Sequence, residues 1–416
     1  MTILANLLKK RKVAFSVLFL LLSFQLLYSF LYPTHGPGGK AWLSFPEVIS
    51  HQKSPLNASE NSLVIKAYGI FTKYYVNTDG GQYILLANNF PKYYLEGQPV
   101  ILDRPLYSFL IAAVAFLPRL IFDSFATVFV SAIFLNFILG FFSVALFYYL
   151  CKKLINSRVA LLSSLLLISS PFFHVWLVQP IPEILTIFII IATLFFLENY
   201  IKNPSRPKLI IFSLIIGTFM LGKMFFAISF FILTLAFYFK RYKEGALFLA
   251  IHLMPLALWY FWVTQVFGLE YYVNEAEFGA VVWLFKIFSR PWYQTVQVFL
   301  DTIPKFVSAV IYGFLLFPVI FALIGFKRLL LKNKEIFCLS LIFSFLALSF
   351  ISNFYIPRHA FHLFPMIYPL AILGIDRVAD FLKRYKKWYA PAFYILIYSI
   401  IIFISSLNIY KFVDYS

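Results

Sequence analysis

Carboxylates and cations outside the basic loops are few in this chain, and they stand in motifs that suit proton transfer and phosphate binding. Those that stand out lie in four places: Asp79; Asp103 with Arg104; Glu183; and Arg358 with His359. A carboxylate can take a proton from a hydroxyl group, and the planar fork of an arginine can hold two phosphate oxygens at once. Lys223, at a Gly-Lys turn signal, is a further candidate cation. We therefore ask whether the fold brings these residues together.

Each candidate also has a purely structural explanation. Asp79 precedes a helical pattern and can cap it by accepting a backbone N–H. Glu183, in the first turn of a helix, interacts favourably with the helix dipole. Arg358 and Lys223 can extend to lipid phosphates, and His359 can form an ordinary interfacial hydrogen bond. A site is indicated only if several of these residues share one location.

Composition places most of the chain in lipid. Of 416 residues, 62% are hydrophobic and 12% are charged, whereas an ordinary soluble domain has roughly 45–50% apolar residues. A soluble globular protein is excluded. The two cysteines, Cys151 and Cys338, each lie within or beside an apolar run, and they indicate neither a disulfide framework nor a zinc site.

Eleven apolar runs have lengths that suit membrane spans, some of them short. They cover residues 13–32, 125–150, 159–173, 183–200, 209–222, 224–239, 246–267, 306–326, 336–352, 360–375 and 389–409. The first run follows four basic residues and lacks a clear cleavage site, so we expect it to be a retained anchor. The runs at 209–239 together are too long for one span, and we expect a hairpin whose tip is Gly222-Lys223.

The distribution of charge fixes the expected orientation. Most of the 35 basic residues fall in alternate short loops, as expected for the cytoplasmic side of a membrane protein, and the N-terminus is then cytoplasmic. The formal net charge of +18 therefore reports topology and contact with anionic lipids, and it does not indicate nucleic-acid binding. On this topology all four candidate places lie at the external face, although they are scattered along the sequence.

Two external segments are expected within a single transmembrane module that covers residues 1–416. The first is the loop 33–124. Within it, the spacing of apolar residues predicts a helix that begins near Thr78, and 105–122 is predicted to lie as a juxtamembrane helix in the interface. The second external segment, 268–305, is rich in aromatic residues and also suits the interface. The predicted fold class is thus an all-α polytopic membrane protein.

These motifs, in this order, resemble the GT-C class of membrane glycosyltransferases. More narrowly, they resemble the group that holds protein O-mannosyltransferases, the aminoarabinose transferase acting on lipid A, and their bacterial relatives. The resemblance rests on four segments: Asp79-Gly80-Gly81-Gln82-Tyr83-Ile84, Asp103-Arg104-Pro105-Leu106-Tyr107, the basic loop 152–158, and the run Ile356 to Pro369. It covers residues 1 to about 410. Pro105 stands where relatives have two prolines, and Glu183 where relatives often have Asp.

The resemblance implies roles for four of the candidates. It places Asp79 at the junction of donor and acceptor, and it gives Asp103 and Arg104 a part in holding the lipid phosphate. Glu183 matches a second acidic position at the outer mouth of a span. From the chemistry of the reaction we expect Asp79 to act as general base, and we expect Arg104 and Arg358, aided by His359 and Lys223, to neutralise the departing phosphate. Asp103 would orient Arg104.

The expected reaction is inverting transfer of a sugar from a polyprenyl-phosphate donor to a hydroxyl of a lipid, glycan or protein acceptor, at the external face of a bacterial or archaeal membrane. No cofactor is assigned. A divalent cation held by the three carboxylates is left open, because no metal-ligand spacing is present. The alternatives are a transporter or flippase for an anionic lipid or lipid-linked saccharide, and a non-catalytic assembly subunit. A transporter would place its charges near the midplane of two repeated halves, whereas these charges cluster at one mouth.

Overall fold

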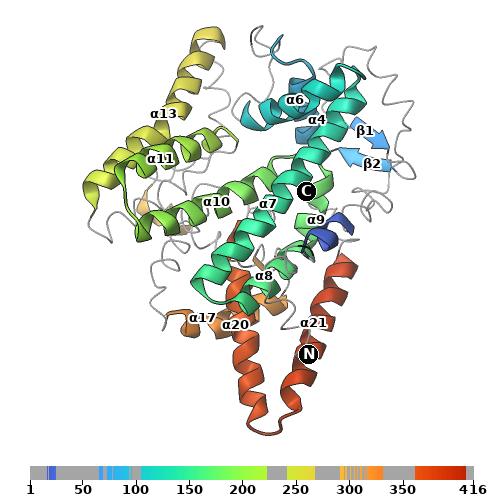
Figure 1. The fold of residues 1–416 in the computed structure, drawn as a ribbon, viewed down its shortest axis with the longest axis vertical. Helices are drawn as coiled ribbons and strands as arrows, with labels where there is room; N and C mark the ends of the chain where they lie inside the picture. Colours follow the sequence, from blue (N-terminus) through green and yellow to red (C-terminus); the bar gives the residue numbers. More distant parts are fainter. Residues whose placement is uncertain are drawn as a thin grey trace. The chain divides into compact units, whose positions relative to one another are not determined.

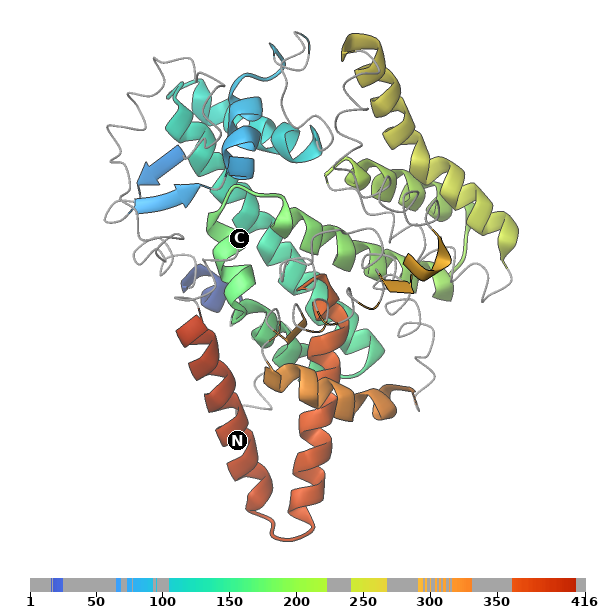
Figure 2. The same cartoon turned by 180° about the vertical axis from the view of Figure 1, so that it is seen from behind.

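The computed structural model is nearly all helical (Figures 1 and 2). It describes residues 16, 18–24, 65–68, 73–76, 78–92, 95, 105–222, 241–267, 291–294, 296–297, 300, 304, 307, 310–311, 314, 316–330 and 361–408. These residues fall into two compact units, 1–192 with 396–416, and 193–395. The boundaries of the units fall within two helices, α10 (Glu183–Lys202) and α21 (Tyr389–Asn408).

The first unit is built around the long helix α7. Its helices are α4 (Thr78–Asn88), α6 (Pro105–Arg119), α7 (Phe125–Leu154), α8 (Ser157–Ile168), α9 (Pro171–Val178) and the first half of α10 (Glu183–Lys202). Both α4 and α6 pack on α7, as Figure 1 shows near its top. The helices predicted near Thr78 and over 105–122 are therefore present.

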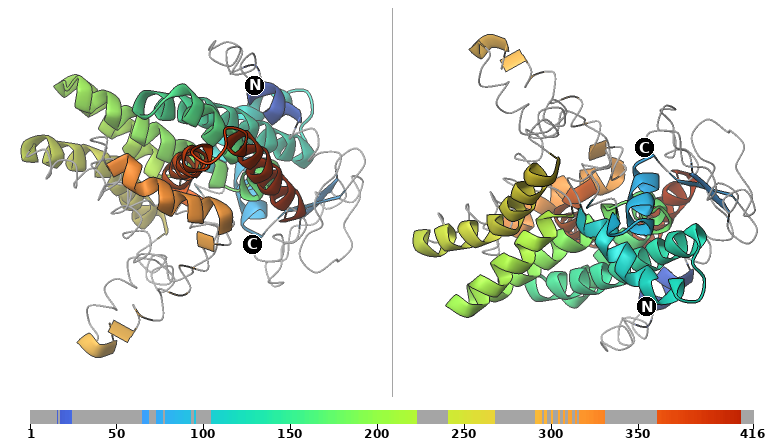
Figure 3. Two further views of the ribbon diagram at one scale, coloured as in Figure 1. Left: turned by 90° about the horizontal axis from the view of Figure 1, so that it is seen from below. Right: turned by 90° about the horizontal axis from the view of Figure 1, so that it is seen from above.

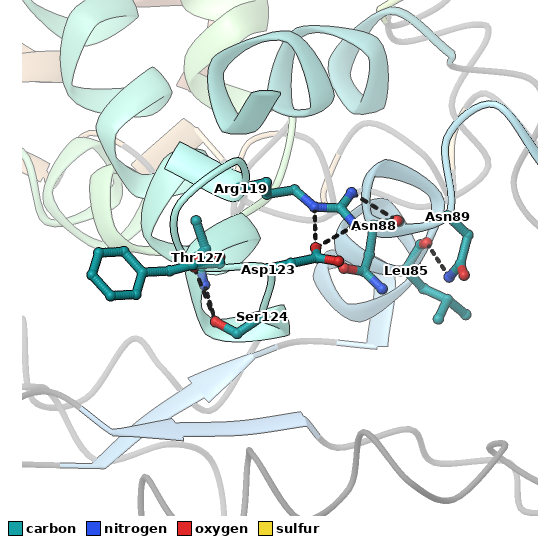
Figure 4. A network of polar contacts seen from close by, with 8 residues as sticks. Leu85, Asn88, Asn89, Arg119, Asp123, Ser124 and Thr127 are labelled. Carbon is teal, nitrogen blue, oxygen red and sulfur yellow. Dashed lines mark hydrogen bonds and ion pairs between the residues drawn. The ribbon is translucent and has the colours of Figure 1, made fainter. Parts of the chain in front are cut away.

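The end of α6 is held by a polar network (Figure 4). The guanidinium of Arg119 donates to Asp123 Oδ1 at 2.7 Å and to the carbonyl of Asn88, at the end of α4, at 2.9 Å. Ser124 then caps α7 by accepting the N–H of Thr127 at 3.2 Å. Because Arg119 satisfies a carbonyl that the end of α4 leaves open, this arginine joins α4 to the end of α6.

A two-stranded antiparallel hairpin departs from the all-α prediction. Strands β1 (Ile65–Tyr68) and β2 (Lys73–Val76) pair with Ile65 opposite Val76 and Tyr68 opposite Lys73. Both strands are rich in β-branched and aromatic residues, which favour extended backbone. The predicted external loop therefore contains a hairpin as well as helices.

The run predicted over 159–173 is not one continuous helix, because two helices occupy this part of the chain. Helix α8 ends at Ile168, and α9 begins at Pro171 after Ser170 with ψ of 131°. Proline forces the residue before it into extended backbone and lacks the N–H that a continuing helix requires. The break at Ser170 follows from this local chemistry.

The second unit contains α11 (Arg206–Met220), α13 (Tyr242–Phe267), α17 (Leu316–Leu330), η2 (Phe361–Leu363), α20 (Phe364–Lys383) and the start of α21 (Tyr389–Asn408). Helices α11 and α13 run side by side (Figure 3). At their contact a Cβ on Gly217 would meet the carbonyl of His252, so only glycine permits this approach. Helix α11 ends two residues before the tip predicted at Gly222.

Helices α17 and α20 cross at a pair of glycines. A Cβ on Gly325 would meet the carbonyl of Leu370, and a Cβ on Gly374 would meet that of Phe321. Beside the crossing, Phe314, Phe361 and Tyr368 form an aromatic cluster, with ring centroids 5.5 to 6.2 Å apart. Small residues that let two backbones touch are typical of helix contacts in membranes.

Four helices of the described residues are long and apolar enough to span a membrane. They cover Thr127–Leu154, Glu183–Lys202, Tyr242–Val266 and Phe361–Lys383. The predicted runs at 224–239 and 336–352 lie outside the described residues. So do most of 13–32, most of 306–315 and most of the predicted second external segment, 268–305. The number of eleven spans therefore stays a prediction.

We expect Gly374→Ala to loosen the crossing of α17 and α20, because overpacking a close contact costs about 1–3 kcal/mol. The measurement is the midpoint of thermal inactivation of the detergent-purified protein, followed by size-exclusion chromatography; it should fall by several degrees. The control is Leu323→Ala on α17, whose side chain is 73% exposed, and this variant should match the wild type. An unchanged midpoint for Gly374→Ala would contradict the packing described here.

Candidate functional site

Glu183 is the candidate that the structure describes in full. It is the first residue of α10, and its side chain is only 3% exposed. The chain reaches it through Pro180 and Pro182, and the helix continues with the N–H of Thr186 donating to the carbonyl of Pro182 at 2.8 Å. Proline is favoured just before and at the start of a helix, since its missing N–H has no partner there. A buried carboxylate thus stands at a helix N-terminus, as the sequence predicts.

Helix α6 contacts this region through Tyr107, which is fully buried. Its hydroxyl donates to Asn136 Oδ1, in the middle of α7, at 2.9 Å. The Glu183 carboxylate lies near enough to act electrostatically on the Tyr107 hydroxyl. Since Tyr107 is the third residue of α6, the start of α6 and the start of α10 meet here.

Helix α4 reaches the same place through Tyr83. The rings of Tyr83 and Tyr107 meet edge to face, with centroids 5.3 Å apart. Tyr83 is buried and lies one helical turn after Asp79, which is the second residue of α4 rather than the residue before the helix. The first turn of α4, the start of α6 and the start of α10 therefore converge on Tyr107.

The environment keeps Tyr107 protonated. Burial raises the pKa of the Tyr107 hydroxyl well above its usual value of 10.0, and the Glu183 carboxylate and Tyr83 raise it further. The hydrogen bond to Asn136 opposes this shift, but the net direction is upward. The hydroxyl therefore donates a hydrogen bond at any physiological pH, and it is no candidate for a general base.

The other predicted site residues are described partly or not at all. For Asp79 the structure gives the backbone alone. Asp103 and Arg104, which immediately precede α6, lie outside the described residues, and so do Lys223, Arg358 and His359. Their roles stay predictions. The described residues contain no group of three or more His, Cys, Asp or Glu side chains that fits a metal ion.

Sequence reasoning missed Tyr107 and Asn136 as parts of this region. The available signal was the position of Asn136, a lone amide between Leu135 and Phe137 in an otherwise apolar stretch. A polar residue inside a membrane helix is costly and usually has a specific partner. Tyr107 lies in the segment Asp103-Arg104-Pro105-Leu106-Tyr107, but the sequence predicted a role only for Asp103 and Arg104.

Comparison with a family model gives a match over part of the chain. Residues 103–266 match the model described as dolichyl-phosphate-mannose-protein mannosyltransferase. This range contains Asp103, Arg104 and Glu183, together with Tyr107 and Asn136. No curated protein matches the chain.

Solved structures match more of the chain. ArnT from Cupriavidus metallidurans, bound to undecaprenyl phosphate, matches with TM-score 0.53 and 14% identity over 82% of this chain and 70% of its own. The Archaeoglobus fulgidus oligosaccharyltransferase, in complex with Zn and sulfate, matches with TM-score 0.55 and 17% identity over 95% of this chain and 53% of its own. The same archaeal enzyme, AglB, with an inhibitory peptide and a dolichol-phosphate, gives TM-score 0.53 and 14% identity over 95% of this chain. The chain thus spans about half the length of the oligosaccharyltransferase.

At these identities the structural likeness concerns the fold. ArnT and AglB are both GT-C glycosyltransferases, and the apolar helices make this chain an integral membrane protein. The resemblance predicted from the sequence is therefore confirmed, by the mannosyltransferase family model over residues 103–266 and by a fold similar to that of two GT-C glycosyltransferases.

Proposed function

We propose that this protein transfers a sugar from a polyprenyl-phosphate donor to an acceptor hydroxyl at the external face of the membrane. The observation that carries the proposal is the convergence of three helix starts, α4, α6 and α10, on the buried Tyr107. Each start carries or directly follows a candidate acid: Asp79, Asp103 and Glu183. Helix N-termini bear partial positive charge and favour an anion such as a phosphate.

The proposed reaction is a single displacement with inversion. The acceptor oxygen attacks the anomeric carbon while Asp79 takes its proton, and the bond from that carbon to the phosphate oxygen breaks. The electron pair stays on the polyprenyl phosphate. Arg104, oriented by Asp103, and Arg358, aided by His359 and Lys223, neutralise the charge that develops there. Glu183 serves as the second carboxylate of the site.

The relatives support the class of donor. ArnT has been crystallised with undecaprenyl phosphate, and a structure of AglB contains an inhibitory peptide and a dolichol-phosphate. These are statements about those proteins, and they make a polyprenyl-phosphate sugar the first donor to test. The direct experiment is sugar release or transfer by the purified protein from a defined polyprenyl-phosphate sugar. Lipid movement without transfer would favour a flippase.

The topology prediction is tested by single cysteines in a variant that lacks Cys151 and Cys338. Impermeant reagents added outside should label Asn57→Cys, Glu277→Cys and Asn353→Cys, because basic loops alternate with these segments. Cysteines at Asn203 and Asn333 should stay protected until the membrane is opened. External labelling at Asn203 would invert the topology and place the site in the cytoplasm.

The carboxylates are tested with amide variants. We expect Asp79→Asn to lower turnover by about a hundredfold or more, because an amide cannot accept the proton. Glu183→Gln should lower it by about tenfold. The matched control is Asp123→Asn, an exposed acid of the same loop that pairs with Arg119, and it should stay within about twofold of the wild type. Near-full activity of Asp79→Asn would leave that residue a structural part of α4.

The phosphate clamp is tested with arginine variants. Arg104→Ala and Arg358→Ala should each slow transfer by at least about tenfold, which is about 1.4 kcal/mol at the barrier. Lysine should restore less than half of the loss, because it cannot hold two oxygens in a fork. Lys223→Ala should have a smaller effect. Arg377→Ala, at an exposed position of α20, is the control. Unchanged initial rates for both arginine variants would assign these residues to lipid anchoring instead.

A further inference from the structure

A buried asparagine joins three segments of the first unit. Asn136 Oδ1 accepts from the Tyr107 hydroxyl at 2.9 Å, and Asn136 Nδ2 donates to the carbonyls of Trp176 at 3.1 Å and Gln179 at 2.6 Å. We call these three hydrogen bonds the Asn136 clasp. These partners determine which way the Asn136 side-chain amide is oriented. The two backbone carbonyls can only accept hydrogen bonds, so the amide nitrogen and not the oxygen must face them. Both Asn136 and Tyr107 have no exposed surface.

The two carbonyls need this donor because of the local sequence. Helix α9 ends at Val178, so the carbonyls of its last turn have no partner within the helix. The residues that follow include Pro180 and Pro182, which have no N–H to offer. Ile181 supplies one, to the carbonyl of Gln179 at 2.8 Å. Asn136 supplies two more, one to the carbonyl of Trp176 and one to that of Gln179, and it thereby holds the turn that leads to Glu183.

Close packing lets so short a side chain reach the turn. Gly140 lies one helical turn after Asn136 on α7, and a Cβ there would stand 2.7 Å from Leu177 Cδ2 and 3.9 Å from Ile184 Cγ2. Helix α7 therefore approaches both α9 and the start of α10 at this level. The Asn136 amide spans the small remaining distance.

We propose that the Asn136 clasp positions the reacting groups, with Asn136 and Tyr107 as positioning residues that hold the start of α10 and the start of α6 in one fixed arrangement. The inference rests on the proposed function, because it gives the clasp a role in sugar transfer. Neither residue touches the reacting atoms. The clasp acts through Glu183 on one side and through Asp103 and Arg104, which directly precede α6, on the other. Errors of about 1 Å in such placement cost about a hundredfold in rate.

The test compares two changes in the full-length protein. Asn136→Asp keeps an acceptor for Tyr107 but removes the donors to both carbonyls, and Tyr107→Phe removes only the bond between α6 and α7. We expect kcat to fall at least tenfold in Asn136→Asp and at least threefold in Tyr107→Phe, with the KM for a polyprenyl-phosphate sugar within twofold of the wild-type value. A purely structural residue would lower the amount of folded protein without this selective loss of kcat.

Two control variants make matched changes elsewhere on α7. Tyr148→Phe removes the hydroxyl of another fully buried tyrosine, twelve residues from Asn136, and Ser143→Ala removes a buried hydroxyl that bonds only within the helix, to the carbonyl of Leu139. Both should keep kcat within twofold of the wild type. Equal losses of kcat in the controls and in the clasp variants would overturn the proposal.

A second measurement does not depend on activity. Ile181 carries the one backbone N–H between Pro180 and Pro182, so hydrogen exchange of a peptide that contains it reports on the turn. Exchange there should be at least tenfold faster in Asn136→Asp than in the wild type, and unchanged in Tyr148→Phe. Unchanged exchange with unchanged kcat would overturn the clasp. Faster exchange in a protein whose wild type transfers no sugar would overturn the proposed function while the clasp's hold on the turn stands.

Discussion

A carbonyl that a helix end leaves unpaired inside a membrane protein must find its donor within the protein, since hydrocarbon supplies none. Asn136 meets this requirement at the break between α9 and α10, where two prolines remove the nearest N–H groups. That one amide bonds both to the turn that leads to Glu183 and to the hydroxyl of Tyr107. In our proposal, the arrangement of the candidate site depends on this amide and therefore on satisfying the backbone of a helix break.

Much of the fold was predictable, because membrane helices can be recognised in a sequence by their length and apolar composition. The run at 183–200 became α10 within two residues, and the run at 389–409 became α21 within one. The break at Ser170 was missed, because a window of hydropathy averages over a single proline. The hairpin of β1 and β2 was not predicted, because four-residue strands leave little trace of alternation between polar and apolar residues in a sequence.

Of the predicted site acids, the structure describes Glu183 in full, and the residues that surround it were not predicted. Glu183 could be singled out because a carboxylate beside Pro182 at the start of an apolar run is rare. Nothing in the sequence pairs Tyr107 with Asn136 across 29 residues, since a hydrogen bond between helices depends on their packing. The sequence likewise gives no sign of the packing role of Gly140, although the close approach of α7 to α9 depends on this glycine. The spacing of residues in the sequence can point to candidate reactive side chains, whereas the residues that position them become visible only in the three-dimensional contacts.

The glycine crossing of α17 and α20 has a consequence for how this part of the protein responds to its surroundings. Backbone meets backbone at Gly325 and Gly374, so neither a water molecule nor an acyl chain fits between the helices there. Attraction at such a contact comes from dispersion and from weak Cα–H···O interactions, and neither requires water to be released. The crossing therefore keeps its strength when the lipid around it is exchanged for detergent, or for a bilayer of another thickness.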